Sequence, residues 1–98
     1  MDLPTFKQSL DQDAPPAGLE RALAALWHEA KGDWDQAHRL AQAEGDAVGA
    51  WVHAYLHRVE SDLSNADHWY RRAGKPPSTA PLKQEWDEIA GALLGDRR

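Results

Sequence analysis

Cysteine is absent from this chain of 98 residues, which excludes disulfide bonds and thiolate chemistry. Long apolar runs are also absent, and none approaches the roughly 18–20 residues that a membrane-spanning helix needs. The opening Met1-Asp2-Leu3-Pro4 has neither the basic nor the apolar segment of a secretory signal. We therefore expect no contact with a membrane and a cytoplasmic location.

Basic residues are in the minority, with 11 Lys and Arg against 16 Asp and Glu and a formal net charge of −5. General nucleic-acid binding needs a basic field that displaces counterions, so we expect no nucleic-acid partner. Phe and Met occur once each, whereas Trp occurs five times. The length suits one domain, and the pattern below predicts that it is all-α.

Apolar residues follow a helical period from Leu19 onward. They recur at i, i+3, i+4, i+7, i+8 and i+11, one stripe of a helix: Leu19, Ala22, Leu23, Leu26, Trp27 and Ala30. Lys31-Gly32-Asp33 ends this helix, and Asp33 with Gln36 forms a capping box for a second helix. The second helix is expected to run from Trp34 to about Glu44.

The same pattern returns 29 residues further along the chain, as Val48, Trp51, Val52, Tyr55, Leu56 and Val59. The cap Asp33 becomes Asp62, and the stop Gly45 becomes Gly74. Each helix pair alone would leave an apolar face exposed, so stacking of the two is favoured. We predict antiparallel hairpins over residues 18–45 and 46–74.

The two ends of the chain differ from these repeats. Residues 1–17 contain three prolines and predict an extended arm, in which Thr5 to Leu10 could form a helical turn or two and Phe6 and Leu10 would contact the body. Residues 80–94 predict a helix that caps the stack and completes a domain over 18–95. Its polar residues, expected to face outward, are Lys83, Glu85, Asp87 and Glu88.

Each hairpin resembles a tetratricopeptide repeat, with a bulky residue in the first helix, a Gly-Asp turn and a small Ala in the second. The second unit follows the consensus spacing at Ala54, Leu63, Ala66, Tyr70, Ala73 and Pro77. The first departs from it at Glu44, and the 29-residue period is shorter than usual. This resemblance implies a helical repeat module. The segments 51–58, 62–66 and 69–74 are also similar to an uncharacterised family of short bacterial proteins, which implies a fold and no activity.

His53 and His57 are the strongest candidates for chemistry. Their i, i+4 spacing projects both imidazoles from one side of a helix, where they could hold a divalent transition metal. His28, the repeat equivalent of His57, is the expected third ligand. Ala54 replaces the Glu that a zincin motif requires, which excludes that metalloprotease pattern. The alternatives are hydrogen-bonded histidines at an interface and a ligand-binding or proton-transfer role.

Two further features are candidates for binding. Arg58, Arg71 and Arg72 could bind a carboxylate or phosphate, or instead pair with acidic neighbours within the chain, namely Glu60, Asp62 or Asp67. Trp69 could border a surface groove, whereas the other four Trp fall on helix stripes and are expected in the core. No nucleophile has a positioned base, so the sequence does not indicate an enzyme.

The sequence therefore predicts a non-catalytic protein-interaction module without a cofactor. Its partner would be another protein or a second copy, docked on the face of the two first helices near His53, His57 and Arg58. Three more residues complete the candidate binding set: His28, Trp69 and Arg72. The alternative is a small-ligand or metal-binding protein that uses a cluster of His28, His53 and His57.

Self-association can be tested directly, because an apolar patch left by so many aromatic residues would favour a homodimer. Size-exclusion chromatography with light scattering should then give the mass of a dimer. A strict monomer at high concentration would remove this part of the prediction.

Overall fold

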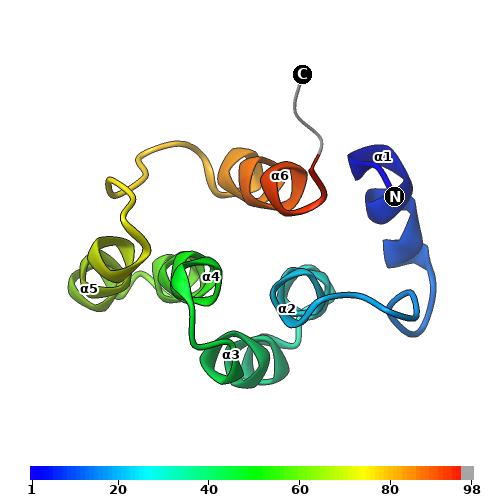
Figure 1. Ribbon diagram of the computed structural model, residues 1–98, viewed down its shortest axis with the longest axis horizontal. Helices are drawn as coiled ribbons and strands as arrows, with labels where there is room; N and C mark the ends of the chain where they lie inside the picture. Colours follow the sequence, from blue (N-terminus) through cyan, green and yellow to red (C-terminus); the bar gives the residue numbers. More distant parts are fainter. Residues whose placement is uncertain (96–98) are drawn as a thin grey trace.

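The computed structural model describes residues 1–95, and within them it is all-helical (Figure 1). None of the helices in this part has the length and apolar character needed to cross a bilayer. The elements are α1 (Leu3–Gln8), a 3₁₀ helix η1 (Ser9–Asp11), α2 (Arg21–Ala30), α3 (Trp34–Ala43), α4 (Ala47–Val59), α5 (Leu63–Ala73) and α6 (Leu82–Leu93).

Helices α3 and α5 begin at the predicted caps. The Asp33 carboxylate accepts a hydrogen bond from the Gln36 backbone N–H at 3.2 Å, and the Asp62 carboxylate accepts one from the Asn65 N–H at 3.4 Å. Each bond satisfies a donor that the first turn of a helix leaves without an intrahelical partner. The capping residues Asp33 and Asp62 are therefore confirmed, whereas the reciprocal half of the capping box does not form, because the Asp33 N–H donates to His28 O and the Gln36 side chain accepts from Arg39.

The turns before these two caps share one backbone geometry. The backbone N–H of each capping Asp donates to the carbonyl five residues earlier, His28 O at 2.8 Å and His57 O at 2.9 Å. The residue before the cap is left-handed in both turns, with φ of 90° at Gly32 and 64° at Ser61. The turn of the first helix pair thus recurs 29 residues later in the second.

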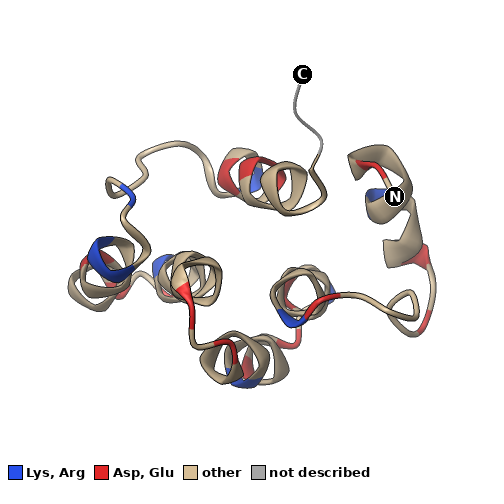
Figure 2. Cartoon of the chain, in the orientation of Figure 1, with Lys and Arg blue, Asp and Glu red and all other residues tan. Residues whose placement is uncertain are grey.

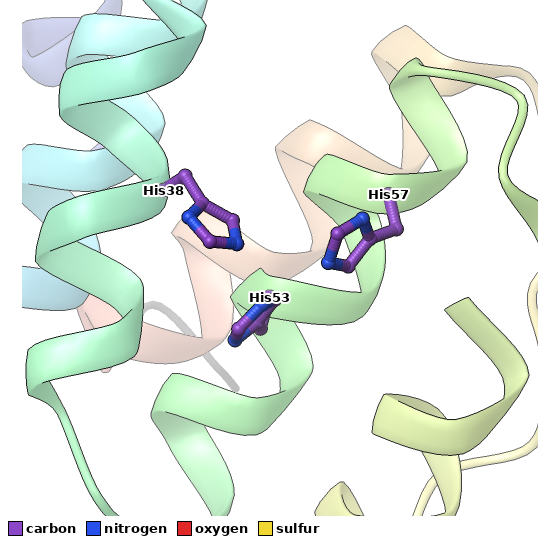
Figure 3. A group of neighbouring side chains, drawn as sticks. All are labelled: His38, His53 and His57. Carbon is purple, nitrogen blue, oxygen red and sulfur yellow. The ribbon is translucent and has the colours of Figure 1, made fainter. Parts of the chain in front are cut away.

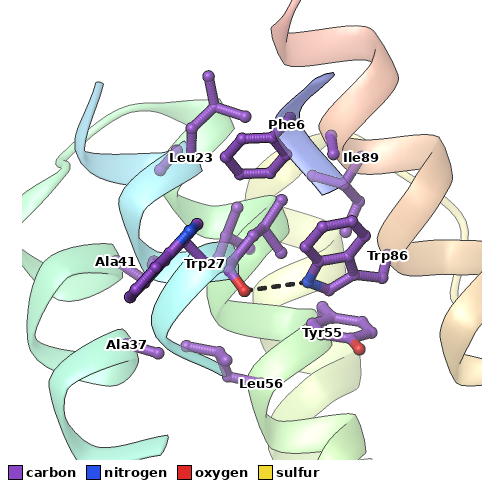
Figure 4. Packing of buried hydrophobic residues seen from close by; sticks show 14 residues of the cluster. Phe6, Leu23, Trp27, Ala37, Ala41, Tyr55, Leu56, Trp86 and Ile89 are labelled. Carbon is purple, nitrogen blue, oxygen red and sulfur yellow. Dashed lines mark hydrogen bonds between the residues drawn. The ribbon is translucent and has the colours of Figure 1, made fainter. Parts of the chain in front are cut away.

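The core lies between α2, α4 and α6, with α1 adding one aromatic ring (Figures 1 and 4). The Trp86 indole donates to the Leu26 carbonyl at 3.0 Å. Phe6 is fully buried and stacks on Trp86, with ring centroids 5.6 Å apart. These contacts join the first and last helices through one apolar cluster, and they meet the need of a buried indole N–H for an acceptor.

Helix α6 forms at its predicted place in the sequence but does not sit as a cap on the end of a stack. It packs across α2 and α4, which are the first helices of the two helix pairs. The reason is its apolar stripe, since Trp86, Ile89 and Ala90 are all buried in the common cluster. Glu85 was expected to face outward, yet it is 1% exposed.

The predicted extended arm, in which Thr5 to Leu10 could form a helical turn or two, is helical over Leu3–Gln8 and Ser9–Asp11. Asp2 accepts a hydrogen bond from the Thr5 N–H at 3.0 Å and so caps α1. Phe6 and the half-buried Leu10 contact the core, as expected. The Trp27 indole donates to the Ser9 hydroxyl at 3.1 Å, which holds the segment against α2.

Most of the twelve stripe positions are buried or half-buried, and the exception is Ala30, which is exposed in the last turn of α2. The repeat-equivalent pair Trp34 and Leu63 also differ. Trp34 is half-buried because its indole donates to the Leu56 carbonyl of α4 at 2.8 Å, whereas Leu63 is 61% exposed.

Gly49 provides a test of the close approach between α4 and the preceding loop. A Cβ at this position would overlap the backbone carbonyl oxygen of Glu44, which cannot move cheaply. Gly49→Ala should lower the free energy of unfolding by roughly 2–3 kcal/mol, measured by urea denaturation. The control is Gly91→Ala in α6, where a Cβ meets nothing within 4 Å and the helix should gain about 0.5–1 kcal/mol. Equal effects of the two substitutions would contradict the packing described here.

Candidate metal centre

Three imidazoles meet where α3 packs against α4 (Figure 3). His38 comes from α3, and His53 and His57 come from α4. One ring nitrogen from each lies within 4.8 Å of the other two. Histidine is a common ligand of transition metals, so this set is chemically suited to one.

The local sequence explains why these rings converge. His53 and His57 are one turn apart on α4 and share a face. Trp34 fixes the start of α3 against α4 through its hydrogen bond to Leu56 O, and its ring stacks on His38 one turn later, at 4.8 Å between centroids. His38 is thereby directed at the pair, with ring centroids 4.5 Å from His53 and 5.4 Å from His57.

Two tryptophan rings, one from α3 and one from α5, pack against the cluster. Trp69 of α5 stacks on His53 with centroids 3.8 Å apart and planes inclined by 11°. Trp34 of α3 meets His57 edge-on at 5.9 Å. Such aromatic surroundings hold the imidazoles in place and exclude much of the water around them.

Burial and mutual proximity favour the neutral forms of His38 and His53. His53 is 3% exposed, and burial, followed by repulsion from neighbouring histidines, lowers its pKa to about 4. Burial and then His57 also lower the pKa of His38, while the carboxylates of Glu60 and Asp35 act in the opposite direction. At neutral pH His53 is therefore the free imidazole, which is the form that binds a metal.

His57 carries a buried nitrogen without a partner. The residue is 8% exposed, and Nδ1 makes no hydrogen bond within residues 1–95. The nearest carboxylate oxygen, Glu60 Oε1, is 3.7 Å from Nδ1, too far for a hydrogen bond. A buried polar atom left unpaired costs free energy, and a rotation of the exposed Glu60 side chain would supply a partner.

His38, not the predicted His28, supplies the third imidazole. His28 lies in the last turn of α2 with its ring edge-on to Trp27. The 29-residue offset of the repeat favoured His28, because His28 aligns with His57. The same offset aligns His38 with Asp67, so the repeat gave no reason to choose His38. His38 could have been found from the expected stacking of the hairpins, which places the second helix of one hairpin against the first helix of the next.

Arg58 does not lie on an open binding face. Its guanidinium pairs with Glu85 of α6 at 2.8 Å and also donates to the Ala80 carbonyl. The predicted partners Glu60, Asp62 and Asp67 are not those it uses. The Tyr70 hydroxyl donates to the other Glu85 oxygen at 2.5 Å, and burial followed by Glu85 raises the Tyr70 pKa. This buried network joins α4, α5 and α6.

Trp69 and Arg72 border a cavity of about 230 Å³ between α5 and the loop that joins α3 to α4. The Arg72 guanidinium lies over the Trp69 ring at 5.1 Å from its centroid. His53 also lines this cavity, together with Glu44 and Asp46. The cavity therefore reaches one member of the histidine cluster.

Comparison of the chain with protein-family models, curated proteins and solved structures found no match. The tetratricopeptide resemblance and the similarity to short bacterial proteins therefore rest on the sequence alone.

The lowered pKa of His53 predicts that the metal-free protein loses stability in acid. Between pH 6.5, the pKa of a free histidine, and about pH 4, His53 is protonated in the unfolded chain and neutral in the folded chain. The free energy of unfolding should thus fall by roughly 2–3 kcal/mol from this site as the pH drops through that window.

The measurement is urea denaturation at pH 7 and pH 4.5 with a chelator present. His53→Gln should lose less stability on acidification than the wild type, while His28→Gln, outside the cluster, should match the wild type. A His53→Gln protein with the same pH dependence as the wild type would contradict the assignment.

Proposed function

We propose that this protein binds a divalent transition metal ion through His38, His53 and His57. The observation that carries the proposal is the approach of three ring nitrogens to within 4.8 Å of one another. The stacking of Trp34 on His38 and of Trp69 on His53, which holds the rings in this arrangement, supports it. The lowered pKa of His53 favours its neutral ring at neutral pH, which is the form that binds a metal.

The ligand set favours particular metals. Three imidazoles suit zinc, copper, nickel and iron, whereas magnesium and calcium require oxygen ligands. A three-histidine zinc site leaves one coordination position for water or another small ligand. The cavity lined by His53 and Arg72 offers a route by which such a ligand would reach the ion.

Glu60 supports the site from outside the cluster. A histidine that binds a metal through one nitrogen usually donates its other N–H to a carboxylate. Glu60 Oε1 lies 3.7 Å from His57 Nδ1, and Glu60 is exposed, so a small rotation of its side chain would close this distance. His57 would then bind the ion through its other ring nitrogen.

The protein-interaction role remains a prediction from the sequence, as does the tetratricopeptide-like relation of the two helix pairs. The repeated turn at Gly32 and Ser61 supports that relation. The proposed docking face, however, is the face of α2 and α4, and α6 of the same chain packs on it. A metal centre is therefore the function that the geometry favours.

Titration of untagged protein with Zn²⁺ by calorimetry tests the proposal. The wild type should bind one equivalent, and His38→Gln, His53→Gln and His57→Gln should each weaken binding at least tenfold, because each removes one of three ligands. Two histidines outside the cluster serve as matched controls, and His28→Gln and His68→Gln should bind as the wild type does. Co²⁺ absorption spectra would report the coordination geometry.

Metal removal gives a second readout. At a free metal concentration about 100 times Kd, binding should add roughly 2.7 kcal/mol to the free energy of unfolding. For a domain of this size, Tm should then fall by about 10–20 °C on addition of a chelator. Absence of stoichiometric binding, or equal weakening by His28→Gln and His38→Gln, would overturn the proposal. Circular dichroism of each variant checks that it is folded.

A further inference from the structure

A second and larger cavity, of about 610 Å³, lies between the N-terminal helices, α2 and the start of α6. Tyr55 of α4 forms part of its lining. Because Tyr55 is two residues from both His53 and His57, its side chain points to the opposite side of α4. This cleft is therefore separate from the histidine cluster, and any ligand it holds is independent of a bound metal.

The carboxylate of Glu29 lines the cleft and has no cationic partner within residues 1–95. Glu29 is half-buried, and the Tyr55 hydroxyl donates to its Oε1 at 3.3 Å. No Lys, Arg or His nitrogen in residues 1–95 lies within 4.0 Å of the Glu29 carboxylate. Burial raises the pKa of Glu29, opposed by the Tyr55 hydrogen bond, which shows that the negative charge there is poorly solvated. A ligand cation would relieve this cost.

The rest of the lining is apolar inside and charged at the rim. Leu10, Leu82 and Trp86 contribute hydrocarbon and aromatic surface, and Leu82 is 38% exposed. Charged residues lie on α1 and α6, the helices beside the cleft (Figure 2), and Lys7 pairs with Asp87 across it at 3.2 Å. Lysine side chains are outnumbered by carboxylates in the lining, so its net charge is negative.

We propose that this cleft binds a small organic cation, in which a primary ammonium group is attached to an apolar body. The ammonium group would pair with Glu29 and the body would lie against Leu10, Leu82 and Trp86. The cavity volume falls within the range of about 300–1,000 Å³ typical of small-molecule sites. Apolar wall surface together with a few placed polar or charged groups is the usual composition of such sites, and Glu29 would be the group that orients the ammonium here.

2-Phenylethylamine is a suitable probe, since it joins a primary ammonium group to one aromatic ring. Saturable binding should be measured by NMR titration of backbone amides, with shifts in α1, α2 and α6. Two analogues with the same aromatic ring, neutral 2-phenylethanol and anionic 3-phenylpropionate, should bind at least about tenfold more weakly, which corresponds to the loss of one ion pair.

Variants locate the site. Glu29→Gln keeps an acceptor for Tyr55 and removes the charge, so it should weaken amine binding about tenfold. Leu82→Ala removes wall surface at a position that is 38% exposed, and it should weaken the amine and the alcohol alike. The matched control is Glu88→Gln, an exposed carboxylate of α6 that bonds Gln84, which should leave binding unchanged.

Three results would overturn the proposal: no saturable binding of the amine up to ~10 mM, equal affinity for the amine and the alcohol, or an unchanged affinity in Glu29→Gln. His38→Gln should bind the amine as the wild type does. Loss of zinc binding in that variant with intact amine binding would separate the two sites, and failure of one proposal leaves the other standing.

Discussion

The enclosure of α4 is the constraint on which this structure depends. Helices α2, α3, α5 and α6 all contact it, and its residues from Gly49 to His57 are buried apart from the half-buried Trp51. A helix surrounded in this way cannot leave its polar groups to water. Arg58 is matched by Glu85, whereas the imidazoles of His53 and His57 meet mainly aromatic rings and another imidazole. Arg58 is thus paired with an opposite charge, whereas His53 and His57 are held by ring contacts.

The features that could be predicted from the sequence are those that depend on residues close together in the chain. Caps, turns and helical periods depend on residues within one or two turns of each other, and so Asp33, Asp62 and the two stripes identified α2 to α5 correctly. The N-terminal segment shows the limit of such signals. Its three prolines favoured an extended chain, but the cap at Asp2 and the burial of Phe6 stabilise a short helix.

The candidate site could be predicted only in part, because it depends on which helix faces meet. The i, i+4 spacing identified His53 and His57, but His38 becomes a neighbour only through the packing of α3 on α4. Glu85 reads as part of a polar helix face, and its burial follows from the route of α6 across α2 and α4. Neither the approach of His38 nor the burial of Glu85 can be predicted from the spacing of residues along one helix.

The position of α6 also governs how the fold can form. Its Trp86 bonds a carbonyl 60 residues earlier and stacks on Phe6 near the start of the chain. Contacts of such long sequence separation slow folding, because the loop must be closed before the contact contributes. During synthesis both helix pairs would emerge before the segment that covers them. The apolar face of α2 and α4 is thus exposed until α6 has been synthesised, and this interval is when the nascent chain is most prone to aggregate.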